Sequence, residues 1–176
     1  MTFPSRRGER HPFFMRLERI TRLDKSGHSF EIGSSCPEDH LCLLEMYLTF
    51  SPRPASQGLP PESDELCRSW VKTLFETGTN LLAWRGNRVI GHAALVPDIK
   101  GGSGEFVIFV DQNERNLGIG TELSRYAFEQ SRQLGIDCVR LTVNMLNSVA
   151  IKLYRKFGFE YCDTDSYERV MSTKLK

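Results

Sequence analysis

The chain lacks the features that mark several large classes of protein. Its 23 Lys and Arg residues nearly balance 22 Asp and Glu, so the formal net charge is only +1, and no basic face indicates a nucleic-acid partner. Although Arg6, Arg7 and Arg10 make the start of the chain basic, no apolar run there or elsewhere is long enough for a signal peptide or a membrane span. These absences predict a soluble cytoplasmic protein with no nucleic-acid and no membrane partner.

Paired cysteines are also missing. The five cysteines are odd in number and include no Cys-x-x-Cys pair, which argues against both a disulfide framework and a zinc site. We therefore expect no metal, and unpaired thiols of this kind suit a reducing compartment.

Two common phosphate-binding motifs are absent as well. A P-loop occurs nowhere, and the dinucleotide fingerprint G-x-G-x-x-G fails because Leu123 stands where its third glycine belongs. What the chain does contain is Gly118 and Gly120, between an apolar strand at 106–110 and an amphipathic helix that opens near Thr121. Glycines let a backbone turn tightly and approach a ligand, and the unpaired N–H groups of a helix start attract an anion. This stretch predicts a pyrophosphate cradle, the alternative being that the glycines only make a tight turn.

The cradle belongs to a longer pattern. Val110, Arg115, Gly118 and Gly120 form V-x4-R-x-x-G-x-G, which resembles motif A of the GNAT superfamily of N-acetyltransferases. Residues 147–159 resemble that family's motif B, N-x-x-A-x-x-L-Y-x-K-x-G-F, at the expected distance downstream. In that family the motif A loop binds the pyrophosphate of acetyl-CoA, so the resemblance implies acetyl-CoA as cosubstrate.

The periodicity between the two motifs predicts a βαβ unit. Apolar residues within 119–134 fall near helical spacing, and Gly135 is placed to end the helix. Val139, Leu141 and Val143 then alternate with more polar neighbours, as in a half-buried strand. Two strands joined by such a helix are parallel neighbours with a right-handed crossover.

The remaining elements are two hairpins, three more helices and a long loop. The hairpins are predicted at 14–32, turning at Asp24-Lys25-Ser26-Gly27, and at 80–96. The helices are predicted from Pro37, near 66–74, and from Asn147 to Gly158. The prolines of segment 49–65 predict an ordered loop or lid.

The resemblance implies an α+β fold of the GNAT type. Its sheet is mixed and mostly antiparallel, is flanked by helices, and contains one parallel strand pair that is splayed to admit CoA. A chain of 176 residues with 40% hydrophobic residues is enough for one core. We expect a mobile segment at 1–12 and a single domain at 13–176.

Residues 20–53 also resemble, more weakly, the GNAT domain of bacterial protein lysine acetyltransferases. The shared features are a short basic strand pair, Pro37-Glu38-Asp39, a helix, and Ser51-Pro52 after an aromatic residue. The arginine that those domains place in the second strand is replaced by Gly33 or Ser34, and the Ser-Arg-aromatic run after the Ser-Pro pair is absent. A protein substrate does not follow from this similarity.

Acetyl transfer to an amine needs a base, a donor to the oxyanion, and a proton for the leaving thiolate. Glu105 stands where many GNAT members carry the carboxylate that takes the amine proton, or else it is a solvated glutamate at a strand end. His92 and water are the alternative bases, since imidazole titrates near pH ~6.5. Tyr154 is the candidate proton donor because tyrosine stays protonated at neutral pH. Its ring can also pack in the hydrophobic core.

The cofactor site implied by the resemblance combines the cradle with the splayed strands. A backbone N–H near Val110 would stabilise the oxyanion. The proposed cofactor-binding residues are Phe109, Val110, Arg115, Asn116, Leu117, Gly118, Ile119, Gly120, Thr121, Asn144, Asn147 and Tyr154.

We therefore expect an N-acetyltransferase that moves an acetyl group from acetyl-CoA to a primary amine by direct attack in a ternary complex. The acceptor, either a small molecule or a protein lysine or N-terminus, is not specified by the sequence, and a homodimer is left open. Two alternatives remain: a non-catalytic acyl-CoA-binding sensor or regulatory module, and an interaction module whose own side chains fill the cleft.

Overall fold

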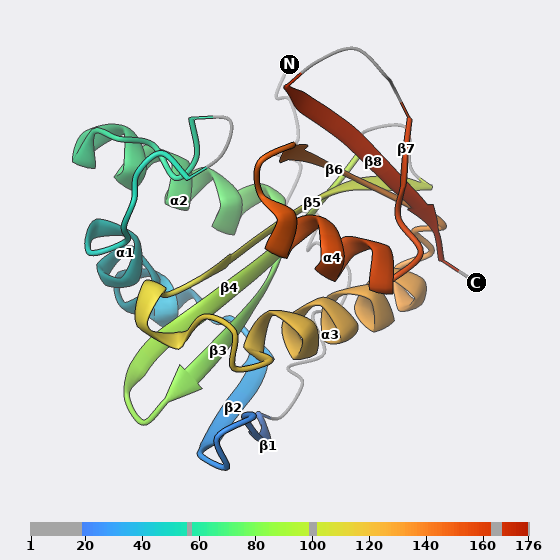
Figure 1. Ribbon diagram of the computed structural model, residues 1–176. Helices are drawn as coiled ribbons and strands as arrows, with labels where there is room; N and C mark the ends of the chain where they lie inside the picture. Colours follow the sequence, from blue (N-terminus) through green and yellow to red (C-terminus); the bar gives the residue numbers. More distant parts are fainter. Residues whose placement is uncertain (1–18, 56–57, 99–101, 163–166, 176) are drawn as a thin grey trace, which may run out of the picture.

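The computed structural model describes residues 19–55, 58–98, 102–162 and 167–175. Within these residues, eight strands form one sheet in the order β1-β2-β3-β4-β5-β6-β8-β7 (Figure 1). The strands are β1 Ile20–Leu23, β2 Ser29–Ser34, β3 Thr79–Arg85, β4 Arg88–Pro97, β5 Ser103–Val110, β6 Cys138–Asn144, β7 Glu160–Tyr161 and β8 Glu168–Lys174. The mobile segment expected at 1–12 lies outside the described residues, as does the start of the predicted first hairpin.

The central strands β5 and β6 are parallel, and every other neighbouring pair in the described part of the sheet is antiparallel. β5 and β6 pair only where Ser103, Gly104 and Glu105 lie opposite Cys138, Val139 and Arg140, after which they part. The mixed sheet with a splayed parallel pair is therefore confirmed.

Helices cover both faces of the sheet (Figure 1). On one face lie α1 His40–Leu48, which follows a short 3-10 turn at Pro37–Asp39, and α2 Asp64–Thr77. On the other lie α3 Ile119–Gln133 and α4 Ser148–Lys156. Each pair of helices packs on its own cluster of buried apolar side chains, so the sheet separates two cores.

The helix ends follow local chemistry. The Asn147 side chain accepts a hydrogen bond from the Ala150 N–H at 3.1 Å and so caps α4, as predicted. Gly135 and Gly158 follow α3 and α4 with φ of 72° and 79°, a backbone conformation that glycine adopts without strain. α3 begins two residues earlier than expected, because Gly118, with φ of 92°, forms its N-cap.

Side chains along β5 alternate between the two cores. Phe106, Ile108 and Val110 belong to the cluster under α3 and α4, whereas Phe109 packs against the cluster under α1 and α2. By the period of two in a strand, Glu105 shares the α1/α2 face with Phe109. One face of β5 is therefore turned toward the α3/α4 core, and the other face is turned toward the α1/α2 core.

His92 is part of a buried polar network on the α1/α2 face. It is completely buried, and its Nδ1 and Nε2 lie 2.7 Å from Tyr47 Oη and 2.9 Å from Asn80 Oδ1. Because the Asn80 amide nitrogen donates to two backbone carbonyls, its oxygen accepts from Nε2, which leaves Nδ1 to accept from the tyrosine. Burial lowers the pKa of His92 from 6.5 to about 3, so the ring is neutral in the fold.

This network makes stability depend on pH. The unfolded chain protonates His92 near pH ~6.5 and the folded chain does not, so its contribution is complete above that pH and is lost as the pH falls toward 3. Between about pH 7 and about pH 5, we expect the unfolding free energy of the wild type to fall by about 2 kcal/mol more than that of His92→Gln. Denaturant titrations at the two pH values measure this difference.

The matched control is His28→Gln, which makes the same substitution at an exposed histidine. Equal pH slopes for the wild type and His92→Gln would show that His92 does not carry this linkage.

Candidate active site

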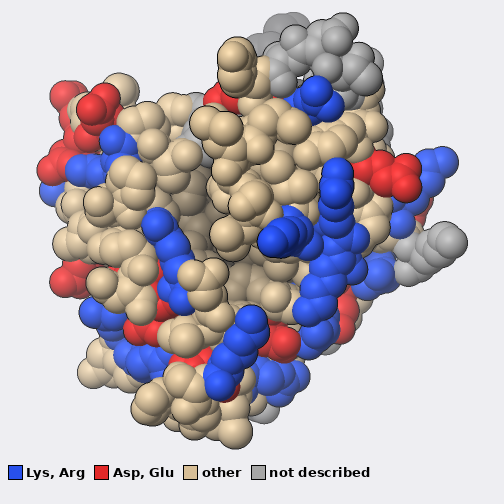
Figure 2. All heavy atoms as spheres, in the orientation of Figure 1, with Lys and Arg blue, Asp and Glu red and all other residues tan. Residues whose placement is uncertain are grey.

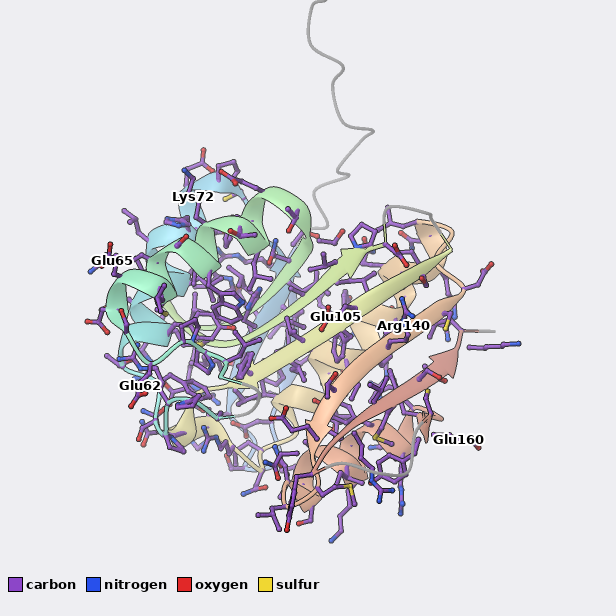
Figure 3. All side chains as sticks on the ribbon, turned by 90° about the horizontal axis from the view of Figure 1, so that it is seen from above. Glu62, Glu65, Lys72, Glu105, Arg140 and Glu160 are labelled. Atoms are coloured by element: carbon purple, nitrogen blue, oxygen red, sulfur yellow. The ribbon has the colours of Figure 1, made fainter. Side chains whose placement is uncertain are left out.

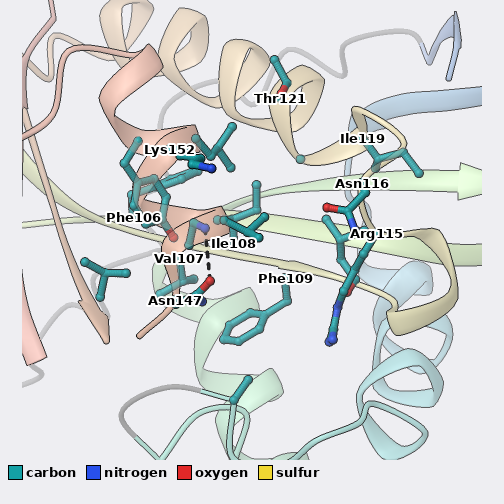
Figure 4. A pocket seen from close by; sticks show the side chains of 18 of the residues that line it. Phe106, Val107, Ile108, Phe109, Arg115, Asn116, Ile119, Thr121, Asn147 and Lys152 are labelled. Atoms are coloured by element: carbon teal, nitrogen blue, oxygen red, sulfur yellow. Dashed lines mark hydrogen bonds between the residues drawn. The ribbon is translucent and has the colours of Figure 1, made fainter. Parts of the chain in front are cut away.

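A pocket of about 640 Å³ lies where β5 and β6 part. Figure 4 looks into it and shows side chains that converge from several elements. Its walls come from β5, from the loop that leads into α3, from α4, and from the Pro-rich segment between α1 and α2. The predicted site residues that line it are Glu105, Phe109, Val110, Arg115, Asn116, Gly118, Ile119, Gly120, Thr121, Asn147 and Tyr154.

The backbone of the cradle curls around the start of α3. Asn116, with φ of 65°, and Gly118, with φ of 92°, are both left-handed, and asparagine is among the few residue types that tolerate this. The first helical hydrogen bonds run from the N–H groups of Thr121 and Glu122 to the Gly118 carbonyl. The N–H groups of Ile119 and Gly120 precede them and have no acceptor within the helix, so this end of the pocket suits an anion.

The two cradle glycines serve different needs. Position 118 requires glycine because its φ is positive, a conformation that residues with a side chain rarely adopt. A Cβ atom on Gly120 would meet Leu153 and Val110 at 3.6 Å, an ordinary contact distance, so the fold leaves room for a small side chain there. Because Gly120 lines the pocket, its lack of a side chain instead keeps space open for a ligand.

Arg115 lines the pocket, but its guanidinium is turned toward the Pro-rich segment. Nη2 donates to the Ser51 carbonyl at 3.0 Å and Nε to the Val110 carbonyl at 3.2 Å, while the group lies 5.1 Å from the Phe50 ring centre. In Figure 4 its side chain runs away from Thr121 and the start of α3. In this structure Arg115 joins the cradle to the segment after α1.

Gln112 makes a second connection between the same two segments. Its amide nitrogen donates to the Thr49 carbonyl, and its amide oxygen accepts from the Ser51 N–H, both at 3.1 Å. Gln112 lies in the short 3-10 turn Gln112–Glu114 between β5 and the cradle. The segment that it holds contributes Phe50, Pro52, Ala55 and Leu59 to the pocket wall.

Glu105 and Tyr154 reach the pocket from opposite sides. Glu105 is exposed and lies beside Arg140 at the last paired position of β5 and β6, as Figure 3 shows from above. Tyr154 lies on α4 and is only 7% exposed, with its ring 5.8 Å from that of Phe159. Burial raises the pKa of Tyr154 to about 12, so its hydroxyl keeps its proton at neutral pH.

Three residues considered from sequence do not line the pocket. Leu117 packs against the α3/α4 core, and the Asn144 side chain accepts from the Leu146 N–H at 2.8 Å within the turn after β6. His92 has both ring nitrogens in the buried network described above, so it is not placed to take a proton from an acceptor.

Sequence reasoning missed several basic residues of the pocket. Lys25, Lys152 and Lys156 line it, and Figure 2 shows Lys and Arg side chains around the hollow in this face. Lys152 and Lys156 are one helical turn apart within the predicted motif B helix, so their spacing was an available signal. Lys25 comes from the first hairpin, and nothing local in the sequence links it to the cradle.

The described residues contain no group of three or more His, Cys, Asp or Glu side chains arranged to hold a metal ion. All five cysteines are free thiols. Among the helices in the described ranges, none is both long enough and apolar enough to cross a membrane.

The chain is similar in sequence to several curated acetyltransferases. The chain is 34% identical over 102 residues to an IAA acetyltransferase of Azospirillum brasilense, which covers 57% of this chain and 65% of that protein. The chain spans between 20% and 65% of the length of the curated relatives that it matches.

Solved structures share the fold. The GNAT domain of S. lividans PAT superposes with a TM-score of 0.78 at 15% identity, over 89% of this chain and 97% of that one. An acetyltransferase of Salmonella typhimurium, yncA, solved with its cofactor acetyl-CoA, superposes with a TM-score of 0.65 at 14% identity, over 84% and 94%.

A family model also covers most of the chain. The model described as the Acetyltransferase (GNAT) family matches residues 43–159, from α1 to the end of the motif B segment. The match includes the parted strands, the cradle and α4, which together form the pocket. The chain therefore belongs to the GNAT family of acetyltransferases.

Proposed function

We propose that this protein is an N-acetyltransferase that moves an acetyl group from acetyl-CoA directly to a primary amine in a ternary complex. The observation that carries the proposal is that Glu105 and Tyr154 line one pocket together with the cradle. A sensor that only binds acyl-CoA needs the cradle but not an acidic group on the opposite side of the gap. The presence of Glu105 therefore favours the enzyme over the sensor.

The cradle would hold the pyrophosphate of acetyl-CoA. The first N–H groups of α3 supply hydrogen bonds and partial positive charge at this end of the pocket. The pantetheine arm would then enter between β5 and β6. Beyond Glu105, β5 has no pairing with β6, so backbone N–H groups on that edge are available for the oxyanion near Val110.

The reacting groups would act from the two faces of the sheet. Glu105, on the α1/α2 side, receives the amine proton either directly or through a water molecule. Tyr154, on the α3/α4 side, donates a proton to the departing thiolate, because its raised pKa keeps it protonated. When bound, acetyl-CoA supplies the activated acetyl group, and the residues of this chain orient it.

The acceptor would enter beside the Pro-rich segment. Phe50, Pro52, Ala55 and Leu59 form an apolar wall of the pocket, and Phe109 lines it from the α1/α2 side of β5, the side that Glu105 also faces. This arrangement suits an amine on an aliphatic carbon, as in a small molecule or a lysine side chain.

Substitution at the cradle tests cofactor binding. Gly120→Asp places a carboxylate among the backbone N–H groups that would receive the pyrophosphate, so we expect acetyl-CoA to bind at least about tenfold more weakly. Gly120→Ala, which fits the available space, is the matched control and should have a smaller effect. Calorimetry measures both affinities, and circular dichroism checks the fold. Unchanged affinity in a folded Gly120→Asp protein would remove the cradle from the cofactor site.

Substitution of the reacting groups tests the chemistry. Glu105→Gln and Tyr154→Phe should each lower kcat by about 10²- to 10⁴-fold with little change in acetyl-CoA affinity, as is typical when a general base or acid is lost. Thiol release with a panel of amines, amino acids, polyamines, aminoglycosides and lysine peptides identifies an acceptor and then provides the assay. Tyr154→Phe keeps the ring that packs on Phe159, so a wild-type kcat in this variant would make the tyrosine purely structural.

A substitution that loosens the Pro-rich segment tests whether this segment borders the acceptor site. Gln112→Ala removes its two hydrogen bonds to Thr49 and Ser51 and leaves the one from Arg115 to Ser51, so the acceptor must then help to order the segment. Ordering of this kind costs on the order of 1 kcal/mol, so we expect the acceptor KM to rise roughly fivefold while acetyl-CoA affinity stays near the wild type. Gln133→Ala, which makes the same substitution at an exposed position at the end of α3, is the control. Equal effects on both ligands would count against an acceptor role for this segment.

A further inference from the structure

The turn between β1 and β2 reaches the cradle. The Lys25 N–H donates a hydrogen bond to the Leu117 carbonyl at 3.0 Å. Two carbon atoms of the Lys25 side chain, Cγ and Cε, lie 3.7 and 3.8 Å from the position that a Cβ on Gly118 would take. The stem of the lysine therefore lies along the glycine that caps α3, and Lys25 lines the pocket.

The turn is held firmly in this position. The fully buried Asp24 carboxylate accepts hydrogen bonds from the Ser26 N–H at 2.8 Å and the Ser26 hydroxyl at 2.7 Å. Its other oxygen lies 2.7 Å from Arg85 Nη2, which also lies 2.9 Å from Glu114. Glu114 immediately precedes the cradle, so a chain of ion pairs joins the hairpin turn to the cradle.

Other basic residues near the turn have acidic partners. Arg22, on the same hairpin, lies 3.6 Å from Glu122 of α3, and Arg88 lies 3.3 Å from Glu114. Among the described residues, no carboxylate lies within 4.0 Å of the Lys25 ammonium. A cation beside a helix N-terminus is unfavourable by itself, because that end of the helix already carries partial positive charge. An anion bound at the same place would remove this repulsion.

We propose that Lys25, which lies on a hairpin outside both family motifs, binds a phosphate group of CoA at the cradle. The proposal rests on the proposed function, which places CoA in this pocket. The ammonium group offers three hydrogen-bond donors on a flexible stem, which suits a phosphate oxygen without demanding one fixed geometry. Both the pyrophosphate and the 3′-phosphate of CoA offer this chemistry.

The test compares CoA binding to the wild type and to Lys25→Met, which keeps an apolar stem and removes the charge. We expect the Kd for CoA, measured by calorimetry, to rise about tenfold in Lys25→Met, with partial recovery in Lys25→Arg. Lys72→Met makes the same charge change on α2, outside the pocket, and should bind CoA like the wild type. The melting temperature of ligand-free Lys25→Met should equal or exceed that of the wild type, because the repulsion at the start of α3 is removed.

The same titrations with 3′-dephospho-CoA identify the phosphate. A penalty for Lys25→Met that persists with this ligand assigns Lys25 to the pyrophosphate, and a penalty that disappears assigns it to the 3′-phosphate. Wild-type CoA affinity in Lys25→Met, or an equal loss in Lys72→Met, would overturn the role of Lys25 alone. Failure of the wild type to bind CoA would overturn the proposed function and this proposal with it.

Discussion

The site depends on the parting of two parallel strands in the middle of the sheet. β5 and β6 pair over three residues and then separate, yet each remains paired along its other edge, β5 with β4 and β6 with β8, over seven residue pairs. Each strand is thus kept in place by its outer ladder while its inner edge is open. Backbone groups on an open edge need partners. The gap is therefore both accessible and suited to a ligand that offers hydrogen-bonding groups.

The cradle at one end of this gap is held from two directions. On one side, Asp24, Arg85 and Glu114 connect it to the first hairpin, and hydrogen bonds from Ser26 and Arg85 hold the pKa of Asp24 well below its usual range. On the other side, Gln112 and Arg115 connect it to the Pro-rich segment. The cradle, which would receive the pyrophosphate, is thus joined to the wall beside which the acceptor would enter. A movement of either segment would therefore shift the position of the cradle.

The sequence predicted the features that depend on neighbouring residues. The position of Gly118 before a helix, the cap at Asn147 and the alternation from Val139 to Val143 are local patterns, and the structure has all three. The helix was expected to open near Thr121, whereas Gly118, with positive φ, caps it so that α3 begins at Ile119, where the apolar pattern also begins. Leu134 is 53% exposed rather than packed, since it lies after the last turn of α3.

Features that depend on contacts between distant segments were not predictable in this way. Both ring nitrogens of His92 are hydrogen-bonded, to Tyr47 of α1 and Asn80 of β3, so the ring is not placed to act as the base. Lys25 reaches the pocket only because the first hairpin packs against the cradle. The prolines of residues 49–65 indicated an irregular segment, but which of its side chains line the pocket follows from the hydrogen bonds of Gln112 and Arg115.

A crystal structure with bound CoA would locate the pyrophosphate and the thiol, on whose positions the proposed reaction depends. We expect the pyrophosphate to lie against residues 118–121 and the thiol to lie in the gap between β5 and β6, with Tyr154 on one side and Glu105 on the other. CoA bound elsewhere, or a thiol that lies away from both side chains, would contradict the proposed reaction.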